Sequence, residues 1–147
     1  MTRYLLVVDF QSGPDDTPME QWEPAEVTAH LDYYRALNAE LEGTGELVDT
    51  TILTGPDLAK VVTSDGTTSV VTDGPFQEIK EWVAGYQIVD VETEERALEI
   101  AARVSAVPGR GGVATAQPIQ VRQIMEDGPA DATAMDDFLD TVTHDPR

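Results

Sequence analysis

The sequence predicts an α+β domain built on an antiparallel sheet, and three observations lead to this prediction. Residues 3–10 and 82–91 do not alternate between polar and apolar positions. This is typical of strands that are covered on both faces. Residues 24–43 and 94–106 repeat apolar side chains at spacings of three and four, as helices do. Strand and helix therefore alternate twice, which is the split βαβ order of a ferredoxin-like fold with both helices on one face of the sheet.

Each predicted helix has recognisable ends. Pro24 suits the first position of a helix, and Gly43 and Gly45 end its apolar repeat, which consists of Val27, Leu31, Tyr34, Leu37 and Leu41. Thr93 is a capping residue for the second helix, whose first turn carries Glu94 and Glu95 beside the positive end of the helix dipole. Pro108 and Gly109 follow as a stop signal.

The other strands are shorter. Residues 46–53 read as a strand, and residues 58–63 and 67–72 read as a hairpin closed by Ser64-Asp65-Gly66. Residues 117–125 supply the last strand. The segment from Gln11 to Glu23 contains Gly, Pro and Asp without a usable period, so we expect a surface loop there.

Two domains of ordinary size do not fit into 147 residues, so we expect one domain with an appendage. The domain spans residues 1–126, and a C-terminal extension spans residues 127–147. Apolar residues recur in the extension at helical spacing among several Asp, which predicts a short amphipathic helix: Met135, Phe138, Leu139 and Val142.

The charge balance excludes two classes of partner. The chain has 9 Lys and Arg against 28 Asp and Glu, a net charge of −19, so nucleic acid and anionic membranes would be repelled. The apolar run in the first ten residues is stopped by Asp9, and no segment reaches the roughly 18 apolar residues of a membrane span. We therefore expect a cytoplasmic protein.

The residue types also limit the chemistry. Without Cys, the chain has no disulfide, thiolate metal site or Cys nucleophile. With only His30 and His144, we expect no metal site, and without a phosphate loop or a dinucleotide fingerprint we expect no cofactor. The run from Gly109 to Gly112 could cradle an anion, but a flexible connection is the simpler interpretation.

The two central strands predict a partner. Two helices cover only one face of the sheet, yet residues 3–10 and 82–91 read as apolar on both. We therefore expect a homodimer that packs through the sheet faces.

A motif in the middle of the chain resembles a known family. Asp73-Gly74-Pro75-Phe76 is followed by Glu78, Lys80 and Glu81, then by Gly85-Tyr86 and Asp90-Val91, and residues 119–122 resemble a closing strand. Together these residues resemble the DGPF-type, YCII-related family over residues 1–126. The resemblance implies a ferredoxin-like dimeric α+β barrel. The wider superfamily is similar to small enzymes, including a dehydrochlorinase and muconolactone-isomerase-like proteins, and carries a proposed His–Asp pair.

His30 is the main candidate for chemistry. It falls on or beside the inward face of the first helix, and Ala29-His30-Leu31 matches the superfamily pattern of a His after Ala early in that helix. An unperturbed imidazole takes or gives a proton near neutral pH. The structural alternative is an imidazole at the edge of the core that is hydrogen-bonded to a backbone carbonyl.

Four further residues complete the candidate site. Asp9 and Asp73 are the acids that could orient His30, although Asp73 could equally cap its turn. Arg122 faces either the cleft or the dimer seam and could hold a substrate carboxylate, or form a structural ion pair. Tyr86 could donate a hydrogen bond to a substrate, or belong to the core.

These residues predict a protein that binds a small polar or anionic organic molecule in a cleft between the first helix and the sheet. If the protein is an enzyme, the reaction is a proton transfer of the lyase or isomerase type without a cofactor. The alternative is a non-catalytic binding or regulatory module, because DGPF-type proteins often accompany sigma factors of the extracytoplasmic type. Nothing in the sequence identifies the ligand.

Overall fold

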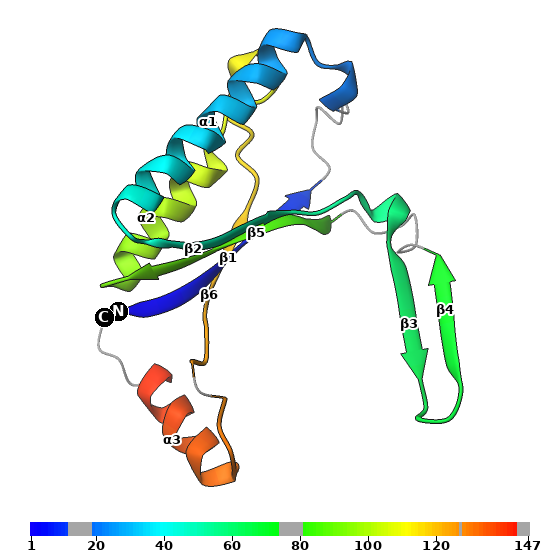
Figure 1. Cartoon of the computed structure of the whole chain (residues 1–147), viewed down its shortest axis with the longest axis vertical. Coiled ribbons are helices and arrows are strands. Elements are labelled where there is room, and N and C mark those ends of the chain that lie inside the picture. Colours follow the sequence, from blue (N-terminus) through cyan, green and yellow to red (C-terminus); the bar gives the residue numbers. More distant parts are fainter. Residues whose placement is uncertain (12–18, 74–80, 127, 144–147) are drawn as a thin grey trace.

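A computed structural model of the chain describes residues 1–11, 19–73, 81–126 and 128–143 (Figure 1). Its main sheet has four strands in the order β2-β5-β1-β6, and every neighbouring pair is antiparallel. The strands are β1 (Thr2–Gln11), β2 (Leu47–Ile52), β5 (Glu81–Val91) and β6 (Ile119–Gln123). This is the strand order of a ferredoxin-like fold, so the predicted fold class is confirmed.

Helices α1 (Pro24–Gly43) and α2 (Glu94–Ser105) lie side by side over one face of the sheet (Figure 1). Pro24 stands at the start of α1, where Glu23 and Glu26 form a reciprocal capping box. The Thr93 side chain caps α2 by accepting a hydrogen bond from the Arg96 backbone. Both helix starts therefore agree with the sequence prediction.

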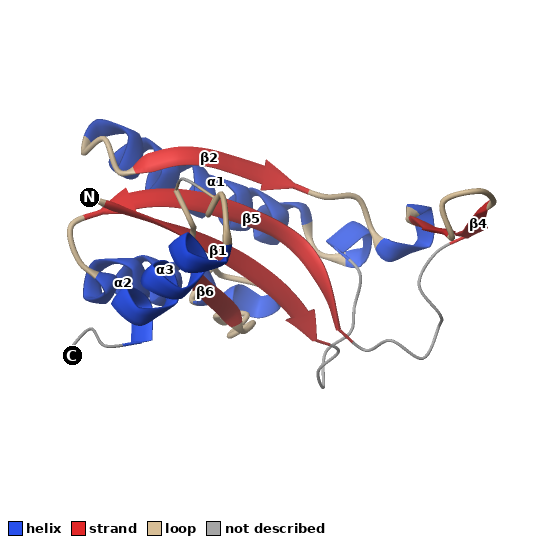
Figure 2. Cartoon of the chain, turned by 90° about the horizontal axis from the view of Figure 1, so that it is seen from below, coloured by secondary structure: helices blue, strands red, loops and turns tan. Residues whose placement is uncertain are grey.

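The two faces of the main sheet differ. The inner face packs on the helices and holds the core, which includes these buried side chains: Leu6, Leu37, Leu41, Val89, Ile100 and Val104. The outer face is seen from below in Figure 2. The strand register places four half-buried side chains there: Leu5, Val7, Tyr86 and Ile88. The prediction that both faces of β5 are apolar holds less well on the inner face, where the polar side chain of Gln87 is buried among the apolar ones.

The predicted hairpin forms a separate two-stranded sheet, with β3 (Lys60–Ser64) paired to β4 (Ser69–Asp73). Its strands lie about two residues later than expected, because Leu58 belongs to a 3-10 turn (Pro56–Leu58) that precedes them. Asp65 accepts hydrogen bonds from the Thr67 and Thr68 backbones and so stabilises the turn. All residues of both strands are exposed, and the hairpin extends away from the main sheet (Figure 1).

The C-terminal helix α3 (Ala132–Thr143) is also present as predicted. It lies on the outer-face side, near the beginning of β1 (Figure 1). A cavity of about 330 Å³ separates it from the strand ends, and Phe138 and Ala134 line that cavity together with Met1, Ile124 and Met125. None of the helices in the described ranges combines the length and apolar character needed to cross a membrane.

Candidate functional site

The imidazole of His30 is fixed by the backbone. His30 lies on the second turn of α1, and its Nδ1 is 2.8 Å from the carbonyl oxygen of Pro108, in the segment that follows α2. Because a carbonyl only accepts, Nδ1 carries the hydrogen and Nε2 of the neutral ring presents its lone pair. A hydrogen bond to a backbone carbonyl is what we expected if His30 were a structural residue. The same hydrogen bond also selects the tautomer in which Nε2 can accept a proton.

Two aromatic rings flank this imidazole. The ring centroids of Trp22 and Tyr34 lie 5.6 and 5.3 Å from that of His30, both edge-on. Burial raises the pKa of Tyr34 above its usual value of 10.0, and neighbouring Tyr33 raises it further. The Tyr34 phenol therefore keeps its proton at neutral pH and is able to donate a hydrogen bond. His30 is itself only half-buried.

A row of polar side chains continues from His30 along α1. Tyr34 and Asn38 follow at intervals of four residues, which places the three on one side of the helix. Asn38 Oδ1 accepts a hydrogen bond of 2.6 Å from Nε2 of Gln87 on the inner face of β5. We call His30, Tyr34, Asn38 and Gln87 the polar stripe.

Gln87 is the unusual member of the polar stripe. Its residue is only 5% exposed, and its Oε1 is buried without a hydrogen-bond partner among the described residues. Exchanging the oxygen and nitrogen of both amides would leave the nitrogen of Gln87 unpaired instead, so either assignment strands one polar atom. A buried polar atom without a partner costs about 1–3 kcal/mol, so Gln87 is held in the core at the expense of stability.

The structure does not bring the two predicted acids to His30. Asp9 points to the outer face, where its Oδ2 accepts a hydrogen bond of 2.7 Å from Gln120. Asp73 ends β4, and its Oδ1 is 2.5 Å from Nζ of Lys60. The Asp73 side chain is 87% exposed, on the projecting hairpin. The rest of the motif, residues 74–76, lies outside the described residues.

Tyr86 and Arg122 also lie away from His30. Tyr86 stands opposite Val7, and Arg122 stands opposite Leu5, so both side chains belong to the outer face. The sequence left two positions open for Arg122, the cleft beside the first helix or the sheet face expected to form a dimer. The side chain lies on the second of these, the outer face. His30, by contrast, lies on the helical side of the sheet.

The glycine-rich run after α2 binds a carboxylate that belongs to the same chain. Residues Arg110–Gly112 form a 3-10 turn in which Gly111 has a φ of 70°. The backbone N–H of Gly111 donates to the carboxylate of Glu26, in the first turn of α1. The loop is therefore tied to α1 rather than being only a flexible connection.

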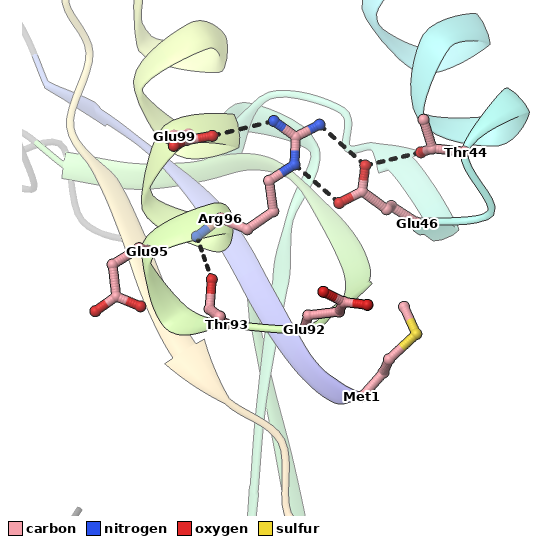
Figure 3. Close-up of a pocket in the computed structure, with 8 residues that line it drawn as sticks. All are labelled: Met1, Thr44, Glu46, Glu92, Thr93, Glu95, Arg96 and Glu99. Atoms are coloured by element: carbon pink, nitrogen blue, oxygen red, sulfur yellow. Dashed lines mark hydrogen bonds and ion pairs between the residues drawn. The ribbon is translucent and has the colours of Figure 1, made fainter. Parts of the chain in front are cut away.

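A cavity of about 460 Å³ lies at the other end of α2, between its first turn and the start of β2 (Figure 3). Arg96 binds Glu46 with two nitrogens, at 2.9 Å each, and Glu99 with a third at 3.1 Å. The hydrogen bonds from Arg96 lower the pKa of Glu46, and those to Glu46 and Glu99 raise the pKa of Arg96. Arg96 is thus held by two carboxylates, and the cavity presents a structural ion-pair network with an excess of acidic side chains.

No group of three or more His, Asp or Glu side chains is placed to hold a metal ion in the part of the chain that the structure describes. The candidate site therefore consists of the polar stripe and the Trp22 ring. Of these residues, only His30 was predicted from the sequence as a functional residue. The available signals were the polar positions 30, 34 and 38 on one helix side and the single Gln within an apolar strand segment.

The comparisons with known proteins identify the family of this chain. No curated protein matches the sequence. The model of the YCII-related domain matches residues 11–121, which include α1, the hairpin, α2 and most of the main sheet. The chain belongs to the YCII-related domain family.

Proposed function

We propose that the protein binds a small polar organic molecule between α1 and the inner face of the sheet, along the polar stripe. The buried Oε1 of Gln87, which has no partner among the described residues, is the observation that carries this proposal. It accepts an N–H or O–H of the ligand. Tyr34 donates to a ligand oxygen, and the Trp22 ring supplies an apolar wall beside His30.

We further propose that Nε2 of His30 exchanges a proton with the bound molecule. The Pro108 carbonyl supports this role because it holds the hydrogen on Nδ1, as a carboxylate does in many catalytic histidines. The reaction class is the cofactor-free lyase or isomerase type. In the isomerase type, Nε2 takes a proton from one carbon and the protonated imidazole returns it to another carbon. In the lyase type, the electron pair left at the carbon forms a double bond and expels a leaving group, with its electron pair, from the neighbouring carbon. Neither Asp9 nor Asp73 takes part in this scheme, because each carboxylate contacts a different side chain.

Deuterium exchange tests the proton transfer directly. Small enolisable lactones are incubated with the full chain in D₂O, and deuterium incorporation at carbon is followed by NMR. We expect His30→Gln to lower the incorporation rate by about 100-fold or more. The thermal midpoint should stay nearly constant, because the Gln amide can donate to the Pro108 carbonyl in the same way.

The matched control is Arg35→Gln, which changes an exposed residue of the same helix. It should leave the incorporation rate unchanged. Incorporation that persists in His30→Gln, or that no lactone shows with the unaltered protein, would contradict the proton transfer. A large loss of thermal stability in His30→Gln would assign the imidazole a structural role.

A second candidate function is that of a regulatory binding module. The exposed, Asp-rich surface of α3 favours it, since Asp136 and Asp137 are both exposed. Deleting residues 126–147 should then abolish binding to a basic peptide partner while leaving lactone exchange intact. Retained binding after this deletion would exclude α3 as the contact.

We also propose that the protein forms a homodimer through the outer face. Half-buried Leu5, Val7 and Ile88 support this, because the described helices α1 and α2 cover the opposite face. Two sheets packed face to face would bury these side chains between them.

A further inference from the structure

The polar stripe offers hydrogen bonds but no positive charge. Its residues are a histidine, a tyrosine, an asparagine and a glutamine, and the Trp22 ring stands beside them. His30 accepts a proton only as the neutral imidazole, so it gives a ligand no positive charge before the reaction. A carboxylate or phosphate bound here would therefore lose its water without gaining a counter-ion.

A negative charge stands one helical turn before His30. Glu26 lies four residues earlier in α1, which puts the two side chains on the same side of the helix. Its carboxylate is held in place, because Oε1 accepts the Glu23 N–H at 2.9 Å and Oε2 accepts the Gly111 N–H. An anionic ligand beside His30 would thus meet a charge of its own sign.

The basic residues of the described chain are bound to acids or lie elsewhere. Arg122 belongs to the outer face, on the opposite side of the sheet from His30. Arg110 is exposed and has an interaction of its own. The others within the described ranges each form an ion pair with Asp or Glu: Arg3, Arg35, Lys60, Arg96 and Arg103. The net charge of −19 adds a field that repels anions from the whole molecule.

The proton transfer strengthens this bias. When Nε2 of His30 takes a proton from the carbon beside a ligand carbonyl, the C–H electron pair forms a C=C bond and negative charge moves to the carbonyl oxygen. An uncharged ligand then becomes a single anion, which the new imidazolium and the Tyr34 hydroxyl stabilise. A carboxylate ligand would become a dianion one helical turn from Glu26.

We propose that the polar stripe selects molecules that are uncharged at neutral pH, with a carbonyl oxygen toward Tyr34 and a hydrogen-bonding group toward Gln87, and that it rejects carboxylates and phosphates. This inference rests on the binding and proton transfer proposed above, and it adds the charge of the substrate. It narrows the polar or anionic ligand predicted from the sequence to the uncharged class.

Two lactones that differ in charge test this selection. Paraconic acid, a γ-lactone with one carboxylate, and its methyl ester are incubated separately with the full chain in D₂O, and deuterium incorporation beside the lactone carbonyl is followed by NMR. Each rate is divided by the rate with free imidazole, which corrects for the different acidity of the two C–H bonds. We expect the corrected rate to be about tenfold or more higher for the ester. Salt at about 1 M, where the Debye length is about 3 Å, should reduce this ratio by raising the rate for the acid.

Two lysine variants place the same charge on opposite sides of α1. Val27 lies three residues before His30 on the same side of the helix, whereas Thr28 is exposed on the other side. Val27→Lys should lower the ester-to-acid ratio by about threefold, because it supplies the missing counter-ion. Thr28→Lys should leave the ratio nearly unchanged.

The outcomes separate the charge selection from the reaction. Corrected rates that are equal for the two lactones, or higher for the acid, overturn the selection and leave the proton transfer standing. A ratio that neither salt nor Val27→Lys changes assigns the preference to shape, which also overturns the selection by charge. Exchange of neither lactone, or exchange that persists in His30→Gln, overturns the proton transfer and this inference with it.

Discussion

The two faces of the main sheet use polar residues in opposite ways. On the inner face a single amide, Gln87, is buried in the core and bonded to Asn38 on α1. On the outer face, half-buried apolar residues stand among charged ones, which lie both on the edge strands and on the central strands, where Arg3 is opposite Asp90. A polar atom without a partner therefore lies inside the core on one face, whereas the polar groups of the other face are open to solvent.

The largest effect expected from this difference compares two neighbours in β1. Leu6 is 1% exposed on the inner face, whereas Leu5 is half-buried on the outer face. Leu6→Ala should lower the free energy of unfolding by about 2–5 kcal/mol at any protein concentration, because it leaves a cavity in the core.

Leu5→Ala is the matched variant. In urea titrations of dilute protein it should cost less than half as much as Leu6→Ala, and the proposed dimer would make this cost grow with protein concentration. Equal costs for the two variants at every concentration would remove the distinction between the faces.

An intermediate effect is expected for the ion pair at the edge of the helical layer. The Glu46 side chain is 13% exposed and bonded to Arg96, which lowers its pKa below the usual 4.5. Its contribution to stability is therefore complete above pH 4.5 and is lost as the pH falls through the lower pKa of the folded state. Glu46→Gln should cost about 1 kcal/mol at pH 7 and flatten the acid side of the stability curve.

Asp49→Asn is the control for that measurement, because no ion pair within the described chain holds the Asp49 carboxylate. Under monomeric conditions it should change thermal stability little at pH 7. If Asp49→Asn lowers the free energy of unfolding as much as Glu46→Gln does, then the Asp49 carboxylate already stabilises the single chain.

The smallest effect concerns the amide in the core. Gln87→Met keeps a similar volume and removes the polar atom that has no partner in the described structure. We expect unfolding by urea to show a change of less than about 1 kcal/mol, because the buried polar penalty disappears while the hydrogen bond to Asn38 is lost. If the proposed binding along the polar stripe exists, the same variant should weaken it. A loss above about 2 kcal/mol would make Gln87 a structural residue.

Local signals were enough to predict most of the fold. Pro24, Thr93 and the Asp65-Gly66 turn act within a few residues, and each begins an element or closes a turn where expected. The hairpin strands were displaced because Leu58 continues a turn that begins at Pro56. The strand order follows from the split βαβ pattern, which has few alternative topologies.

The candidate site was less accessible from the sequence. His30 was identified from its place on a helix, but its contact with Pro108 spans 78 residues and depends on how two segments pack. The alternation of side chains along a strand places Asp9 and Leu6 on opposite faces of the sheet. Which of these faces packs against α1 depends on the tertiary fold, so the sequence did not show that Asp9 lies away from His30. The orphaned oxygen of Gln87 depends on every neighbour of that side chain, so no local pattern predicts it.

The segment after α2 has a consequence for the position of the imidazole. Glu26 and His30 are one helical turn apart, and they bind Gly111 and Pro108 of the same segment. The two contacts act as paired tethers, so a displacement of that segment would also release the hydrogen held on Nδ1. Substitutions at Gly111 would then displace the imidazole of His30 from a distance, through the backbone of a single segment.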